Sequence, residues 1–120
     1  MLKRKLISGY RSKIDNFKGA YISHVPEIKS IPLDDKSKGL LLATDGLWDE
    51  LSNEDARNLY ETHGNSSNKF LKETMEKALE IASNKSGITL VQMKKIEIGR
   101  RRSLHDDITL LFIDLKSLIK

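Results

Sequence analysis

Apolar and polar positions follow two kinds of pattern along this chain, and each pattern predicts a different element. Residues 40–44 form a short, almost unbroken apolar run, and residues 107–115 hold a second run that is rich in apolar side chains. Short runs without strict alternation are typical of strands that are covered on both faces. Between the two runs, apolar residues recur at every third or fourth position, which indicates amphipathic helices. The pattern therefore predicts an α+β fold.

The first helix is predicted to begin after Ser52, because Ser52 and Asp55 have the spacing of a capping box. It should run to about Thr62 and end at Gly64. A second helix fits residues 67–84, with Gly87 as its stop, and residues 89–95 add a short helical turn. The apolar side chains of the second helix form one expected buried stripe: Leu71, Met75, Ala78, Leu79 and Ala82.

The chain before the first strand is less regular. Residues 21–33 alternate only briefly, and Pro26 and Pro32 each remove a donor from any ladder, so we expect an edge strand or a broken one. Residues 34–39 are a polar turn. Residues 1–20 are basic, and we interpret them as a connecting segment in preference to a mitochondrial presequence. Residues 116–120 are a short tail.

Two strands buried on both faces require a layer of structure above and below them. The helices can supply one layer. The other would need a second sheet, and a chain of 120 residues with about three strands does not contain one. We therefore expect this chain to be an incomplete portion of a larger domain.

Composition and charge exclude several classes of function. The chain is 38% hydrophobic and 32% charged, which is typical of a soluble folded protein. It has no cysteine, which excludes a disulfide and a thiolate nucleophile. The longest apolar runs are too short for a transmembrane helix. Residues 100–102 are three arginines, but no aromatic residue is interleaved with them, so we predict a solvated loop, with no nucleic acid and no membrane as partner.

The candidate chemistry lies at the strand ends. Asp45 ends the first strand, and Asp106 begins the second. If the strands pair antiparallel, these two carboxylates converge at one end of the sheet, where they suit a hard cation such as Mg²⁺ or Mn²⁺. The local alternatives are a tight turn at Asp45 in which Gly46 takes a positive φ, and a charged strand end at Asp106 that is exposed to water.

Only one residue of the pair Asp106 and Asp107 can face the same cation as Asp45, because neighbouring side chains on a strand point to opposite faces. The adjacent His105 is a weaker candidate for acid–base chemistry.

These stretches also carry a family resemblance. Residues 42–49, Leu-Ala-Thr-Asp-Gly-Leu-Trp-Asp, resemble a late metal-ligand motif of the PP2C class of protein serine/threonine phosphatases. Residues 105–109, His-Asp-Asp-Ile-Thr, resemble the last motif of that family, and the two motifs come in the family's order. The match covers residues 21–115. Details at residues 26–28, 52–55 and 99–102 are most similar to the pyruvate dehydrogenase phosphatase branch and its plant relatives.

The resemblance implies a fold: the C-terminal portion of a β-sandwich flanked by helices. It assigns the metal ligands to Asp45 and Asp106. Asp107 occupies a position usually held by Asn and is expected to hydrogen-bond the loop, while Trp48 is expected to pack beneath the site without chemistry.

The resemblance also implies an activity, the hydrolysis of phosphoserine and phosphothreonine in proteins at a centre of two Mg²⁺ or Mn²⁺ ions. The partner would be a phosphorylated protein, and both the cytoplasm and the mitochondrial matrix remain open as its location. Complete domains of this family are more than twice as long, and their earlier part supplies most of the site. We therefore expect the chain alone to be inactive. The alternative is a non-catalytic remnant that acts as a binding or regulatory module.

Overall fold

The computed structural model describes residues 21–118, and its contacts divide the chain into two units, residues 1–32 and 33–120. The described part of the first unit, residues 21–32, contains no strand, and all its side chains are exposed. The edge or broken strand predicted for residues 21–33 is therefore wrong. Pro26 and Pro32 remove two ladder donors from a segment that alternates only briefly. The predicted basic connecting segment, residues 1–20, lies outside the described residues.

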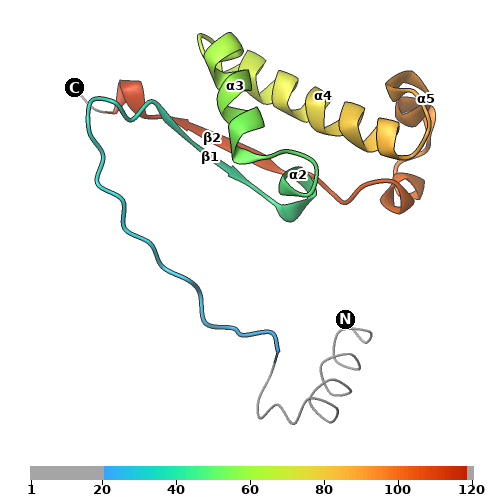
Figure 1. Ribbon diagram of the computed structural model, residues 1–120, viewed down its shortest axis with the longest axis horizontal. Coiled ribbons are helices and arrows are strands. Elements are labelled where there is room, and N and C mark those ends of the chain that lie inside the picture. The colour runs from blue at the N-terminus through green and yellow to red at the C-terminus, as the bar shows by residue number, and fades with distance from the viewer. Residues whose placement is uncertain (1–20, 119–120) are drawn as a thin grey trace. The chain divides into compact units, whose positions relative to one another are not determined.

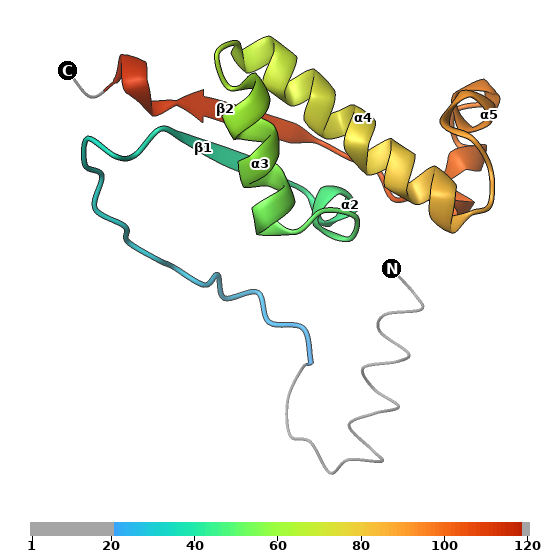
Figure 2. The same cartoon turned by 45° about the horizontal axis from the view of Figure 1, so that its top comes forward.

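The second unit confirms the α+β class. Its larger elements, in chain order, are β1 (Gly39–Ala43), α2 (Asp45–Trp48), α3 (Asn53–His63), α4 (Ser67–Lys85), α5 (Leu90–Lys95) and β2 (Leu110–Asp114). Two short 3₁₀ turns, η1 (Arg100–Ser103) and η2 (Leu115–Ser117), lie before and after β2. Figures 1 and 2 show α3 and α4 together on one face of the two-stranded sheet.

The sheet is antiparallel, as the candidate metal site requires. Gly39 lies opposite Asp114, and Ala43 lies opposite Leu110. The predicted polar turn leads into β1, and the Asp34 carboxylate accepts hydrogen bonds there from the backbone N–H groups of Lys36 and Ser37, at 2.9 and 3.1 Å. β2 is shorter than predicted, because residues 107–109 approach β1 through side-chain and single backbone hydrogen bonds and not through a regular ladder.

The helix ends follow the sequence signals. Ser52 and Asp55 form the predicted capping box, and α3 ends one residue past the predicted Thr62. Gly64 follows it with a φ of −69°, so this end does not use the left-handed conformation. At the end of α4, Gly87 does take a positive φ of 70°. The Ile88 N–H there bonds the Ser83 carbonyl, and the Gly87 N–H bonds the Asn84 carbonyl, both at 3.1 Å, which is a Schellman motif. The short helix expected over residues 89–95 is α5.

The buried face of α4 is rotated from the predicted stripe. The buried residues are Phe70, Thr74, Ala78, Ala82 and Ser83, while Leu71, Met75 and Leu79 are only half-buried. Phe70 sets this orientation, because its ring packs against those of Tyr60 and Phe112 with centroids 5.4 and 5.0 Å away. Thr74 can be buried because its hydroxyl donates to the Phe70 carbonyl at 2.7 Å.

The core lies between the sheet and the helices. Leu47, Leu51 and Ala78 are at most 3% exposed, and six half-buried apolar residues pack around them: Leu41, Ala43, Leu59, Ile81, Ile108 and Leu110. On the other face of the sheet, Leu40, Leu42 and Leu111 are 46%, 46% and 56% exposed. Within the described residues the helices therefore form a layer on one face of the sheet only, and the apolar second face lacks the further layer that we expected this chain not to contain.

Candidate metal site

The two predicted ligands lie at the same end of the sheet. Asp45 is the first residue of α2, two residues after β1 ends, and Asp106 lies four residues before β2 begins. Figure 1 shows α2 beside the segment that leads into β2. Because the strands are antiparallel, the end of β1 and the approach to β2 are neighbours, so the fold brings these two segments together as the sequence predicts.

Thr44 ties the two segments to each other. Its N–H donates to the Thr109 carbonyl at 3.1 Å. Its hydroxyl donates to the Asp107 carbonyl and accepts from the Thr109 N–H, also at 3.1 Å each. Three hydrogen bonds through one residue thus fix the backbone next to Asp45 against the backbone next to Asp106.

Gly46 is buried where this approach is closest. A Cβ atom added to it would lie 2.3 Å from the Asp107 carbonyl oxygen and 3.2 Å from that of Asp106. Its φ is not positive: among the described residues only Gly87 and Gly99 are glycines with positive φ. The tight turn considered for Asp45 and Gly46 is therefore not the structure, since Gly46 is required for close backbone approach and not for a left-handed conformation.

The carboxylates themselves face solvent. Asp45 is exposed, and no residue in the range 21–118 donates a hydrogen bond to its side chain or forms an ion pair with it. Asp106 is also exposed, and one of its oxygens accepts the Asp107 N–H at 2.8 Å. Asp106 therefore keeps free lone pairs, as a metal ligand must.

The residues on either side of Asp106 make contacts within the loop that leads into β2. Arg102 lies 3.7 Å from the Asp107 carboxylate, an exposed pair that contributes little to stability. The Nδ1 atom of His105 lies 2.8 Å from the Asp106 carbonyl, so this nitrogen must carry a proton and donate it. The other ring nitrogen, Nε2, is buried and has no hydrogen-bond partner among the described residues. In this arrangement His105 orients the Asp106 backbone.

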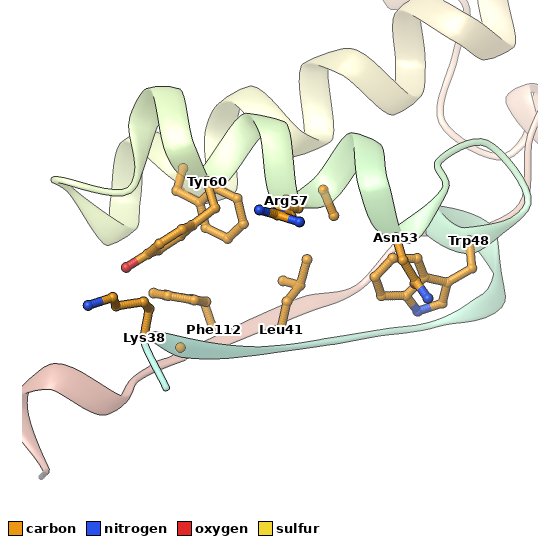
Figure 3. A pocket seen from close by; sticks show the side chains of 10 residues that line it. Lys38, Leu41, Trp48, Asn53, Arg57, Tyr60 and Phe112 are labelled. Carbon is orange, nitrogen blue, oxygen red and sulfur yellow. The ribbon is translucent and has the colours of Figure 1, made fainter. Parts of the chain in front are cut away.

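Trp48 lies elsewhere than predicted. It is not buried beneath the site but is 37% exposed, at one end of a pocket of about 230 Å³ between α3 and β1. Figure 3 shows its ring beside Asn53, with Tyr60 and Phe112 toward the other end. No local sequence pattern predicted this pocket, because its walls come from separate parts of the chain.

The type of ligand atom at this site suits a hard cation, but the number of ligands is smaller than such a cation requires. Aspartate oxygens are the ligands that Mg²⁺ and Mn²⁺ prefer, and Mg²⁺ requires six oxygen ligands. Within residues 21–118 no three His, Asp or Glu side chains form a group that could hold a metal ion. The described residues can thus supply two carboxylates from two joined segments.

None of the helices within residues 21–118 has both the length and the hydrophobicity of a membrane-spanning helix.

Comparison with known proteins agrees with the motif pair. The sequence model of the family described as protein phosphatase 2C matches residues 7–87. Probable protein phosphatase 2C 46 of Arabidopsis thaliana is 34% identical over 113 residues, which are 94% of this chain and 29% of that protein. Probable protein phosphatase 2C 79 from the same plant is 34% identical over 114 residues, covering 93% and 29%.

A third relative, probable protein phosphatase 2C 28 of Oryza sativa subsp. japonica, is 32% identical over 103 residues, which are 86% of this chain and 25% of the relative. The chain therefore spans less than a third of the length of these relatives. No solved structure matches it significantly.

Proposed function

Because this chain belongs to the protein phosphatase 2C family, we propose that it forms part of a metal-dependent phosphatase that hydrolyses phosphoserine and phosphothreonine in proteins. Asp45 and Asp106 hold one of two Mg²⁺ or Mn²⁺ ions in this proposal. One observation supports it most: the segment with Asp45 and the segment with Asp106 are fixed against each other through Thr44 and Gly46, although they are more than sixty residues apart.

Each residue has a defined part in this proposal. When bound, the cations polarise the phosphoryl oxygens and lower the pKa of water, which supplies the nucleophile at neutral pH. Asp45 and Asp106 bind and orient; neither transfers a proton. Thr44 and Gly46 set the separation of the two segments, and His105 holds the Asp106 backbone.

The 120 residues alone are inactive in this proposal. Two carboxylates leave most of an octahedral Mg²⁺ shell to water, and Mg²⁺ gives up water reluctantly. The pyruvate dehydrogenase phosphatase branch stays a prediction, because the relatives named above are plant proteins called only probable protein phosphatase 2C. The proposed substrate is therefore a class, phosphorylated protein, and no particular protein.

The test is manganese-dependent release of phosphate from a phosphoserine peptide by the full-length gene product that carries this segment. Asp45→Ala and Asp106→Ala should each raise the Mn²⁺ concentration required for half-maximal activity at least about tenfold, since even residues that only support metal ligands alter affinity by that much. Asp107→Asn is the matched control and should leave activity unchanged.

Activity that survives both Asp45→Ala and Asp106→Ala would contradict the ligand assignment. A full-length product that binds Mn²⁺ but releases no phosphate from any phosphoserine or phosphothreonine peptide would instead favour the alternative, a binding or regulatory module.

A further inference from the structure

Three consecutive arginines make up most of η1, and they are held in different ways. Arg100 and Arg102 have side chains that are 81% and 69% exposed, as expected for a solvated loop. Arg101 is half-buried. Its Nε atom donates to the Ile96 carbonyl at 2.8 Å, and its Nη2 atom donates to the Lys94 carbonyl at 2.5 Å. One arginine of the three is therefore built into the fold.

The Arg101 side chain closes the end of α5. The last carbonyls of a helix have no partner within the helix, and a basic side chain can satisfy them. Lys94 lies in the last turn of α5, and Ile96 is the residue that follows the helix. The two bonds leave from different nitrogens of one planar guanidinium, so they fix its direction as well as its distance. The single nitrogen of a lysine lacks this fork.

The helix that Arg101 binds is itself fixed to the helical layer. Met93 of α5 is fully buried. The Lys94 ammonium pairs with both carboxylate oxygens of Glu76 on α4, at 2.6 and 2.8 Å. Thr89 and Gln92 form a capping box at the start of α5. A side chain attached to the end of α5 is therefore attached to α4 as well.

The backbone of Arg101 leads from this support to the candidate metal ligand. Its carbonyl accepts from the Leu104 N–H at 2.8 Å and from the His105 N–H at 3.1 Å. Asp106 follows directly, and the His105 ring bonds its carbonyl. On the far side of Asp106, the Thr44 hydroxyl holds the next carbonyl along the chain. Asp106 thus lies between two attachments, one through Thr44 and one through Arg101.

We propose that Arg101 is a positioning residue for the metal site, which fixes the Asp106 segment against the helices and contacts neither metal nor substrate. This inference rests on the proposed function in one respect, that Asp106 is a metal ligand. A ligand that is held in place before the cation arrives loses less conformational freedom on binding, so the attachment strengthens binding of the metal.

The sign of the effect separates positioning from charge. A positive charge near a cation site opposes binding of the cation. Charge alone therefore predicts that removal of any of the three arginines tightens Mn²⁺ binding or leaves it unchanged. Positioning predicts that removal of Arg101 weakens it, and that removal of Arg100 or Arg102 does not.

The probe is Mn²⁺ alone, titrated into the full-length gene product that carries this segment, with free Mn²⁺ measured by electron paramagnetic resonance. The relevant site is the one that Asp106→Ala removes. Arg101→Gln should raise its dissociation constant about three- to tenfold, at or below the lower end of the range for groups that support metal ligands. Arg101→Lys keeps the charge and should still weaken binding, because it lacks the fork. Arg100→Gln and Arg102→Gln are the matched controls and should not weaken it.

Hydrogen exchange of the 120-residue chain without metal gives a second measurement. The Leu104 and His105 amides should exchange faster in Arg101→Gln than in the parent. The Ile88 amide, which bonds the Ser83 carbonyl at the end of α4, should keep its rate. A general loss of stability would instead accelerate all three amides, and circular dichroism should show that the variant keeps the helix content of the parent.

The proposal is overturned if Arg101→Gln binds Mn²⁺ as tightly as the parent, if all three glutamine variants weaken binding equally, or if the Ile88 amide is accelerated as much as that of His105. A higher KM for a phosphopeptide at saturating Mn²⁺ would also overturn it, because Arg101 would then bind the substrate.

Two outcomes separate this inference from the proposed function. A parent product that binds Mn²⁺ at the Asp106 site, loses affinity with Arg101→Gln and releases no phosphate would contradict the proposed function and support the positioning role. A product from which Asp106→Ala removes no bound Mn²⁺ would contradict both.

Discussion

Replacing Gly46 with alanine tests helix propensity against packing, because the two predict opposite changes in the free energy of unfolding. Helix propensity alone predicts that Gly46→Ala stabilises the protein by about 1 kcal/mol, because Gly46 lies within α2. Packing predicts the reverse, since the new methyl would lie 2.3 Å from the Asp107 carbonyl oxygen, which is backbone and can move only with its loop. Overpacking of this kind costs about 1–3 kcal/mol.

The movement also breaks contacts. Pushing Asp107 away from α2 separates it from Thr44, whose hydroxyl holds two hydrogen bonds to the opposite segment. Each such bond contributes about 1 kcal/mol. We therefore expect Gly46→Ala to lower the free energy of unfolding by about 2–3 kcal/mol in total, against the direction of helix propensity.

The assay is urea unfolding of the 120-residue chain at low protein concentration, followed by circular dichroism, with hydrogen exchange of the Thr109 amide as a local probe. Gly87→Ala is the control. It places a side chain at a φ of 70° with no atom within 4 Å, so it should lower stability by about 1–2 kcal/mol without loosening the Thr109 amide relative to α4. A Gly46→Ala chain that is as stable as the parent, or more stable, would refute the reasoning.

Two further predictions concern pH and the exposed sheet face. The Ser52 hydroxyl, and to a smaller extent the Ser52 backbone N–H, donate hydrogen bonds to the Asp55 carboxylate and hold its pKa below the ordinary value of 3.8. The stability that this cap contributes is therefore fully present above pH 3.8 and is lost as the pH falls through the lowered pKa of the folded state. Asp55→Asn should abolish this part of the pH dependence of urea unfolding. Leu42→Thr, on the exposed face of β1, should reduce aggregation measured by light scattering and change the free energy of unfolding by less than about 0.5 kcal/mol. Leu41→Thr, on the covered face of the same strand, should lower the free energy of unfolding by about 2 kcal/mol or more. Equal effects of the two substitutions would contradict the one-sided packing.

The sequence predicted best what short-range chemistry determines. Ser52 and Asp55 satisfy backbone groups within one turn, and Gly87 supplies a conformation that few other residues adopt, so both helix ends could be located without knowledge of the fold. The antiparallel pairing that joins the segments of Asp45 and Asp106 was also predicted, because only that direction places the two motifs at one end of the sheet. Their role as metal ligands stays a proposal.

What depends on distant partners could not be predicted in the same way. On α4, Phe70 and Leu71 point about 100° apart, and either can begin a stripe that continues through Ala78 and Ala82. Only the rings of Tyr60 and Phe112 decide that Phe70 is the buried one. The one-sided cover of β1, by contrast, was expected, because the sequence offers helices for one face and no second sheet for the other. The pocket beside Trp48 combines residues from both strands and three helices, so no local pattern could reveal it.

The two segments joined at Thr44 lie far apart along the chain, and this distance affects the order of folding. α3 and α4 are neighbours in sequence and pack through a short connection, so their contacts close small loops. The bond between Thr44 and Thr109 closes a loop of sixty-five residues. The entropy of closing a loop grows with its length, and non-local pairings form more slowly than local ones. We therefore expect the helical hairpin to be in place before the strands pair, and the end of the sheet that carries Asp45 and Asp106 to be among the last parts of the molecule to take shape.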